Sequence, residues 1–236
     1  MATFVLVHGG GHGGWCWKPL AQLLRDAGQE VYAPTLSGLA DCAHVLSPDL
    51  GLETHITDIA GLLAYEDLRD VILVGHSYGG MVITGAADRA IERVQRLVYL
   101  DAAIPEDGEA LVDVSPGLLK LAGDTRVVNG VQLGLFPGAA ASAIYGLSGS
   151  DYEDWALARL TPHPWRTFTD PLHLTNPGLV SAIPRSIVNC SGSLEKRPAA
   201  LRSRWSNAEH VWLVDTGHDL MLSETQAIAS LLLHLV

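Results

Sequence analysis

The sequence contains few cysteines, and they stand far apart. Cys16, Cys42 and Cys190 are an odd number at wide spacing, which fits neither a disulfide framework nor the short ligand spacing of a zinc site. Cysteines of this kind are typical of a reducing compartment.

Basic residues are also scarce. Lysine and arginine number 15 against 26 aspartates and glutamates, which gives a formal net charge of −11. A protein that binds nucleic acid requires a basic surface, so the balance argues against such a partner. We interpret the acidity as favouring solubility, and it does not indicate the charge of a substrate.

Long apolar runs are missing as well. No stretch approaches the ~18 consecutive apolar residues of a membrane span. The start, MATFVLVHGG, has no basic segment and no cleavage site of a signal peptide. We therefore predict a soluble, cytoplasmic protein without a membrane partner. The sequence leaves the oligomeric state open, and a homodimer is compatible with it.

What is present is an alternation of strand and helix patterns in the first hundred of the 236 residues. Strands that alternate with helices indicate a largely parallel sheet with helices on both faces, which is an α/β fold. The patterns predict strands at 3–7, 30–34, 71–75 and 96–101, and helices at 19–27, at 54–66 and from about residue 77.

The alternation stops in the middle of the chain. Eight of the twelve prolines fall between residues 102 and 185, and the alternation then returns. We predict a core of residues 1–101 and 186–236 interrupted by a helical cap at 102–185. An excursion without regular structure is the alternative, although loops of this length are uncommon. The returning patterns are strands at 186–190 and 210–214, a helix at 198–205, and a last helix with a capping box at Ser223–Gln226.

The sequence GHSYG at residues 75–79 follows a predicted strand and precedes a predicted helix. A serine at the apex of such a turn adopts strained backbone angles, and the flanking glycines leave room for it. The strain exposes the Ser77 hydroxyl at the carboxyl end of the sheet. Serine needs a base and an acid to become a nucleophile.

The glycine-rich segment HGGGHGG at residues 8–14 follows the first strand. It can supply one of the two N–H donors that a developing oxyanion needs, and we predict an oxyanion hole of the Gly10 and Tyr78 N–H groups. The segment also matches a dinucleotide fingerprint, but the second strand has no acid at its end for the ribose. His8 and His12 are predicted to support the loop rather than to bind a metal.

One of the ten histidines occupies the position of a base. His218 follows the last predicted strand and precedes the last helix, and in an α/β-hydrolase the histidine is the last member of the catalytic group.

Together these segments resemble the α/β-hydrolases of the plant methylesterase and hydroxynitrile lyase group, including salicylate-binding methylesterases, and resemble bacterial esterase-like members more closely. The matching segments are FVLVHGGGHGGWCW, ILVGHSYGGMV, LVYLDAAIPEDG and DTGHDLML. The resemblance implies an α/β-hydrolase fold with Ser77 as nucleophile, His218 as base, and Gly10 and Tyr78 as the oxyanion hole.

The acid departs from the family pattern. In the family it follows the strand that here is SIVNC, where this chain reads CSGSLE at residues 190–195. Ser193 is nearest to the expected place, and Glu195 comes two residues later. Asp101, at the end of the preceding core strand, is the other location used in this fold, and we predict that it is the acid. The alternative is that its carboxylate binds the first N–H groups of the cap.

A second departure concerns lyase chemistry. Hydroxynitrile lyases of this group carry a lysine after the base and a threonine in the oxyanion loop, where this chain has Asp219 and Gly9. We therefore predict hydrolysis of a small, largely apolar carboxylic ester through an acyl-serine, with no cofactor and no metal. A lyase that uses Ser77 and His218, or a ligand-binding protein with weak hydrolase activity, are the alternatives.

Overall fold

The structure, a computed structural model, describes residues 1–117, 125–137, 141–194 and 197–236. Its main sheet has six strands in the order β2-β1-β3-β4-β8-β9, and every neighbouring pair is parallel. This confirms the predicted α/β-hydrolase fold with a parallel central sheet. The strands are β1 Thr3–Val7, β2 Glu30–Tyr32, β3 Val71–His76, β4 Val94–Leu100, β8 Arg185–Cys190 and β9 His210–Val214.

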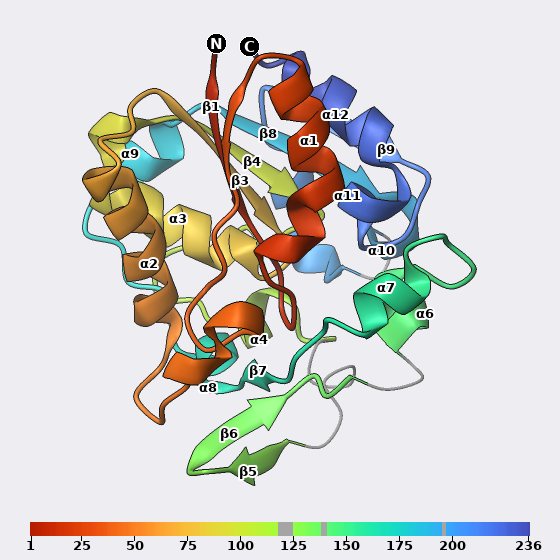
Figure 1. Cartoon of the computed structure of the whole chain (residues 1–236). Helices are drawn as coiled ribbons and strands as arrows, with labels where there is room; N and C mark the ends of the chain where they lie inside the picture. The colour runs from red at the N-terminus through yellow and green to blue at the C-terminus, as the bar shows by residue number, and fades with distance from the viewer. Residues whose placement is uncertain (118–124, 138–140, 195–196) are drawn as a thin grey trace.

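Helices cover both faces of the sheet (Figure 1). One face carries α1 Lys18–Asp26, α11 Leu220–Ser223 and α12 Thr225–Leu233. The other carries α2 Leu52–Tyr65, α3 Gly79–Arg89 and α9 Pro177–Ala182. Within the described ranges, none of the helices combines the length and the apolar character that crossing a bilayer requires.

The alternation of side chains along β1 supplies both layers of the core. Phe4 and Leu6 pack into the cluster under α1 and α12, whereas Val5 and Val7 pack into the cluster under α2 and α3. Successive side chains of a strand point to opposite faces, and a parallel sheet with helices on both faces buries both sets. The four consecutive apolar residues of β1, Phe4 to Val7, are therefore what this position in the sheet requires.

The insertion between β4 and β8 is not purely helical, which corrects the prediction for residues 102–185. An antiparallel sheet in the order β5-β6-β7 lies at the far end of the molecule from the two termini (Figure 1). The turn between β5 and β6 is Asn129–Gly130, with φ of 50° and 81°, the conformation of a tight hairpin turn. The elements are α4 Leu111–Val114, β5 Arg126–Val128, β6 Val131–Gly134, α6 Ala141–Tyr145, α7 Glu153–Leu157, β7 His163–Pro164 and α8 Arg166–Thr169.

Two smaller predictions near the carboxyl terminus also need correction. The predicted helix at 198–205 is a 3-10 helix, Ala199–Ser206. The capping box at Ser223 is wrong, because α12 begins at Thr225 after Glu224 and has no side-chain cap. The Ser223 hydroxyl instead shares a hydrogen bond of 2.7 Å with the Thr216 hydroxyl.

Candidate active site

Ser77 lies in the turn between β3 and α3, in a left-handed conformation with φ of 54°. The turn is possible because the chain passes close to itself there. A Cβ on Gly79 would lie 2.5 Å from the Val7 carbonyl oxygen, and one on Gly75 would lie 2.7 Å from the Gly79 carbonyl oxygen. Any larger residue would push these backbones apart, so the two glycines permit the strained turn that the sequence predicts. Ser77 itself is only partly buried.

His218 lies in the loop that joins β9 to α11. Its Nε2 is 2.8 Å from the Ser77 Oγ, which is within the reach needed for a proton to pass between the two atoms. The side chain of His218 is 24% exposed. Parallel strands end at the same edge of the sheet, and this brings two residues 141 positions apart into contact.

Asp101 directly follows β4, and its side chain is completely buried. Its Oδ2 is 2.6 Å from His218 Nδ1. Its Oδ1 accepts a hydrogen bond of 2.5 Å from the Ser193 hydroxyl and a short one from the Arg197 guanidinium. The Cys190 thiol also interacts with this carboxylate. In the described part of the chain, no N–H group at the start of the insertion is among the partners of Asp101.

The two titratable groups affect each other strongly. Burial alone would raise the pKa of Asp101, but the hydrogen bond from His218 and the charges of His218 and Arg197 hold that pKa below its usual 3.8. Burial alone would lower the pKa of His218, but the bond to Asp101 and its negative charge raise it above 6.5. Asp101 is thus a carboxylate in the neutral pH range, and it favours the protonated form of His218.

The two residues predicted to form the oxyanion hole, Gly10 and Tyr78, belong to segments that meet at Ser77. A Cβ on Gly9 would lie 2.8 Å from the Ser77 Cβ, so the glycine-rich loop packs directly against the serine. Neither the Gly10 N–H nor the Tyr78 N–H donates a hydrogen bond to any residue that the structure describes. Both residues are buried, and an unpaired buried N–H is costly unless something else accepts from it.

Side chains of the insertion cover the glycine-rich loop. A Cβ on Gly10 would lie 2.9 Å from Leu135 Cδ1 and 3.0 Å from Phe168 Cζ. The Phe168 ring stacks on the His163 ring at 4.3 Å between centroids. The surroundings of Gly10 on this side are therefore largely apolar.

The two alternative positions for the acid, and the two aspartates that flank His218 in the sequence, have different partners or lie outside the described residues. Ser193 contacts Asp101 rather than His218, and Glu195 lies outside the described residues. The Asp215 carboxylate accepts a hydrogen bond of 2.6 Å from the Ser191 hydroxyl. Asp219 is fully buried and lies 2.9 Å from His12 Nε2. Among the described residues, Asp101 is therefore the one whose carboxylate forms a hydrogen bond with the His218 ring.

A surface hollow of about 490 Å³ opens beside the glycine-rich loop, and it is lined by Gly14, Trp15, Ala33, Thr35, Ala40, Asp41, Arg159 and Thr161. Ser77, Asp101 and His218 do not line it, so it is not the space around the nucleophile. In the parts of the chain that the structure describes, no three histidine, cysteine or acidic side chains are grouped to hold a metal ion.

Known proteins resemble this chain in sequence and in fold. A sequence profile of the Alpha/beta hydrolase family matches residues 4–231. The chain is 37% identical over 242 residues to the carbendazim hydrolyzing esterase of Nocardioides sp. (strain SG-4G), with 97% of each chain covered. It is 28% identical over 256 residues to methylesterase 18 of Arabidopsis thaliana, with 98% of this chain and 95% of the relative covered. The crystal structure of polyneuridine aldehyde esterase aligns with a TM-score of 0.81 at 22% identity, over 100% of this chain and 99% of that one, and has the same fold.

Proposed function

The chain belongs to the alpha/beta hydrolase family and is an esterase, and on that basis we propose that Ser77 attacks the carbonyl carbon of a small, largely apolar carboxylic ester. The observation that carries the proposal is the continuous hydrogen-bonded path from Ser77 Oγ to His218 Nε2 at 2.8 Å and from His218 Nδ1 to Asp101 Oδ2 at 2.6 Å.

In the proposed mechanism, His218 takes the proton of Ser77 as the hydroxyl oxygen attacks the ester. The imidazolium that forms is stabilised by the buried Asp101 carboxylate, which also holds the ring in the required tautomer. The N–H groups of Gly10 and Tyr78 bind the oxyanion, and each such donor contributes about 2.7–4 kcal/mol to transition-state stabilisation. His218 then donates its proton to the departing alcohol and leaves an acyl-serine.

The second half of the reaction repeats these steps with water as the nucleophile. His218 removes a proton from the water, the oxyanion forms again at the two N–H groups, and the free acid leaves as Ser77 regains its proton. Every proton passes through His218 Nε2.

The apolar character of the substrate is supported by the contacts above Gly10. Leu135 and Phe168 cover the loop on the side of the insertion, so an ester carbonyl that reached Gly10 would bring its substituent against hydrocarbon. Similarity to a carbendazim hydrolyzing esterase and to a methylesterase also favours a small-molecule ester.

The lyase alternative gains no support from the residue after the base. Asp219 is an acid whose carboxylate is paired with His12, and it provides no cation to hold a leaving anion. The chemistry at Ser77 is therefore proposed to be hydrolysis.

The proposal is tested with p-nitrophenyl acetate and a fluorophosphonate probe. We expect a burst of p-nitrophenol and one probe molecule per chain, both lost in Ser77→Ala. Turnover without dependence on Ser77 would contradict the mechanism, and ligand binding without labelling would favour the binding-protein alternative.

A further inference from the structure

The peptide between Gly9 and Gly10 is held by a buried histidine. His8 Nδ1 lies 2.9 Å from the Gly9 carbonyl oxygen, and His8 Nε2 accepts a hydrogen bond of 3.1 Å from the Leu36 N–H. The ring therefore carries its hydrogen on Nδ1 and donates it to Gly9. Because the C=O and N–H of a trans peptide point in opposite directions, this bond turns the Gly10 N–H away from His8.

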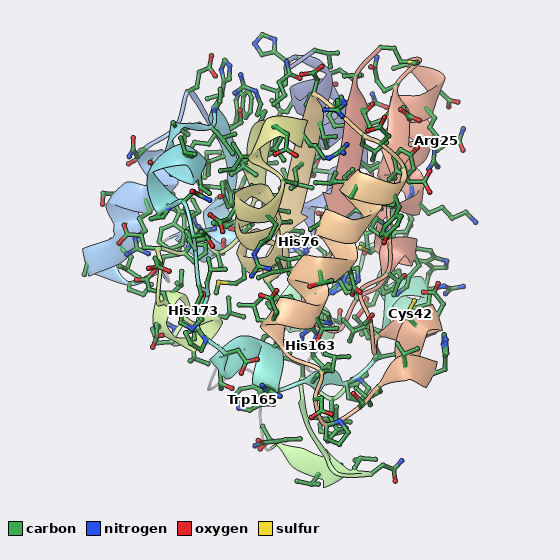
Figure 2. All side chains as sticks on the ribbon, turned by 90° about the vertical axis from the view of Figure 1, so that its left-hand side faces the viewer. Arg25, Cys42, His76, His163, Trp165 and His173 are labelled. Atoms are coloured by element: carbon green, nitrogen blue, oxygen red, sulfur yellow. The ribbon has the colours of Figure 1, made fainter. Side chains whose placement is uncertain are left out.

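The following peptide, between Gly10 and Gly11, is held at both ends. The Gly10 carbonyl oxygen accepts from His12 Nδ1 at 2.8 Å, and the Gly11 N–H donates to His163 Nδ1 at 3.1 Å. His163 belongs to the insertion and lies near the lower end of α2 (Figure 2). Of the four polar groups in the two peptides, only the Gly10 N–H has no partner in the residues that the structure describes.

His12 also joins this loop to the loop of the catalytic base. Its Nε2 lies 2.9 Å from the Asp219 carboxylate, and Asp219 is the neighbour of His218 in the chain. Each ring nitrogen of His12 thus lies within hydrogen-bond distance of an oxygen atom, Nδ1 in the glycine-rich loop and Nε2 in the loop of the base.

Three buried histidines thus hold this segment of glycines, and the buried Tyr145 hydroxyl also donates a hydrogen bond of 3.3 Å to the Gly10 carbonyl oxygen. Glycine has a wide range of backbone angles, and the sequence of residues 9–11 does not itself determine where the Gly10 N–H points. Burial lowers the pKa of His8 to about 3 and that of His163 well below 6.5, so both rings stay neutral and keep one donor and one acceptor nitrogen. A donor that is fixed before the reaction stabilises a transition state more than one that must reorient.

We propose that His8, His12 and His163 are positioning residues that direct the Gly10 N–H to the oxyanion, an inference that rests on the proposed function. They do not contact the reacting atoms. They act through the two peptide groups on either side of Gly10.

The test uses asparagine and glutamine as substitutes for the two ring nitrogens. Asparagine places an amide atom near the position of Nδ1, and glutamine places one near Nε2. At His8 and at His163, the loop is bound by Nδ1 and another part of the protein by Nε2. His8→Asn and His163→Asn therefore keep the bond to the loop, whereas His8→Gln and His163→Gln keep the other bond.

We expect each glutamine variant to have a kcat/KM at least ten-fold below that of the matching asparagine variant, approaching the 10²–10³-fold loss typical of one missing oxyanion donor. The affinity for an aryl trifluoromethyl ketone, which forms a tetrahedral adduct with the serine, falls in parallel. The thermal midpoints of the two variants at one position should be similar, because each loses one hydrogen bond. Equal kcat/KM values within both pairs, or lower values for asparagine, would overturn the inference.

Measuring at two positions keeps the test valid if one pair does not fold. Comparing the turnover of the unaltered protein with that of Ser77→Ala tests the proposed function separately. This comparison does not involve the asparagine and glutamine variants. If turnover depends on Ser77 and the pairs do not differ, the positioning role alone is wrong. If turnover does not depend on Ser77, the proposed function and the inference fall together.

Discussion

The Asp101 carboxylate lies 2.6 Å from the ring of His218, although 117 positions separate them in the chain. Ser193 donates a hydrogen bond to this same carboxylate. It stands nearest to the place where the resemblance to the methylesterase group would put the acid. Asp101 and Ser193 thus approach each other from the ends of two adjacent strands, β4 and β8.

Replacing Asp101 by asparagine should reduce kcat about 10⁴-fold, because an amide stabilises neither the imidazolium nor the required tautomer. The Arg197 guanidinium, whose side chain is 10% exposed, would lose its ionic partner, so the thermal midpoint should fall as well. Asp215→Asn is the matched control, since Asp215 is exposed and contacts Ser191. Nearly unchanged turnover in Asp101→Asn would exclude Asp101 as the acid.

An aspartate at position 193 should partly replace the missing acid. The Ser193 hydroxyl lies 2.5 Å from Asp101 Oδ1, so a carboxylate built there would lie beside Arg197 and near the His218 ring. We expect the double variant Asp101→Asn with Ser193→Asp to regain at least ten-fold of the kcat/KM that Asp101→Asn loses. The comparison is made in steady-state hydrolysis of p-nitrophenyl acetate, and no gain over the single variant would show that the two locations are not equivalent.

The pH profile should report His218. The base must be neutral to accept the proton of Ser77, and the pKa of His218 is raised above 6.5 by Asp101 despite burial. Activity is therefore lost as the pH falls through this raised pKa, and the acid limb of the kcat/KM profile should have its midpoint above 6.5. In Asp101→Asn the two largest interactions that raise the pKa of His218 are removed, while burial and the smaller effect of the Asp219 charge remain, so the limb should move to lower pH. A limb that does not move would mean that another group controls it.

Replacing two different glycines by alanine should affect two different properties, the activity in one case and the stability in the other. A Cβ on Gly9 would lie 2.8 Å from the Ser77 Cβ and 2.9 Å from the His76 ring, so Gly9→Ala should displace the loop and reduce kcat/KM about 10²-fold. Gly61 lies within α2 with no atom near its would-be Cβ, and Gly61→Ala should stabilise the protein by roughly 0.5–1 kcal/mol without loss of activity. Activity assays and thermal melts of both variants test the pair.

Much of the core could be predicted because its signals are local. The bounds of β1 match the apolar run at 3–7, and Gly75 and Gly79 mark a turn whose crowding the structure shows directly. The apolar run and the G-x-S-x-G spacing are patterns of neighbouring residues that can be recognised in a single sequence, although the crowding at Gly79 comes from the distant Val7 carbonyl oxygen.

The features that the sequence did not reveal depend on contacts between segments that are far apart in the chain. No local pattern marks Arg197 as a partner of Asp101, because 96 positions separate them, and none marks His163 as a partner of Gly11. The hairpin in the insertion is different, since its Asn129–Gly130 turn is a recognisable signal that the high proline content of the region obscured. The division of the chain at residues 101 and 185, the cytoplasmic location and the role of each site residue stay predictions.

The most direct test of the account is the identity of the covalent intermediate. The protein is mixed with p-nitrophenyl acetate, quenched in acid during the burst, and digested for mass spectrometry. We expect one acetyl group on the peptide that contains Ser77, in an amount equal to the burst, and none in Ser77→Ala. A burst of the same size with the acetyl group on another residue, or with no acylated peptide, would contradict it.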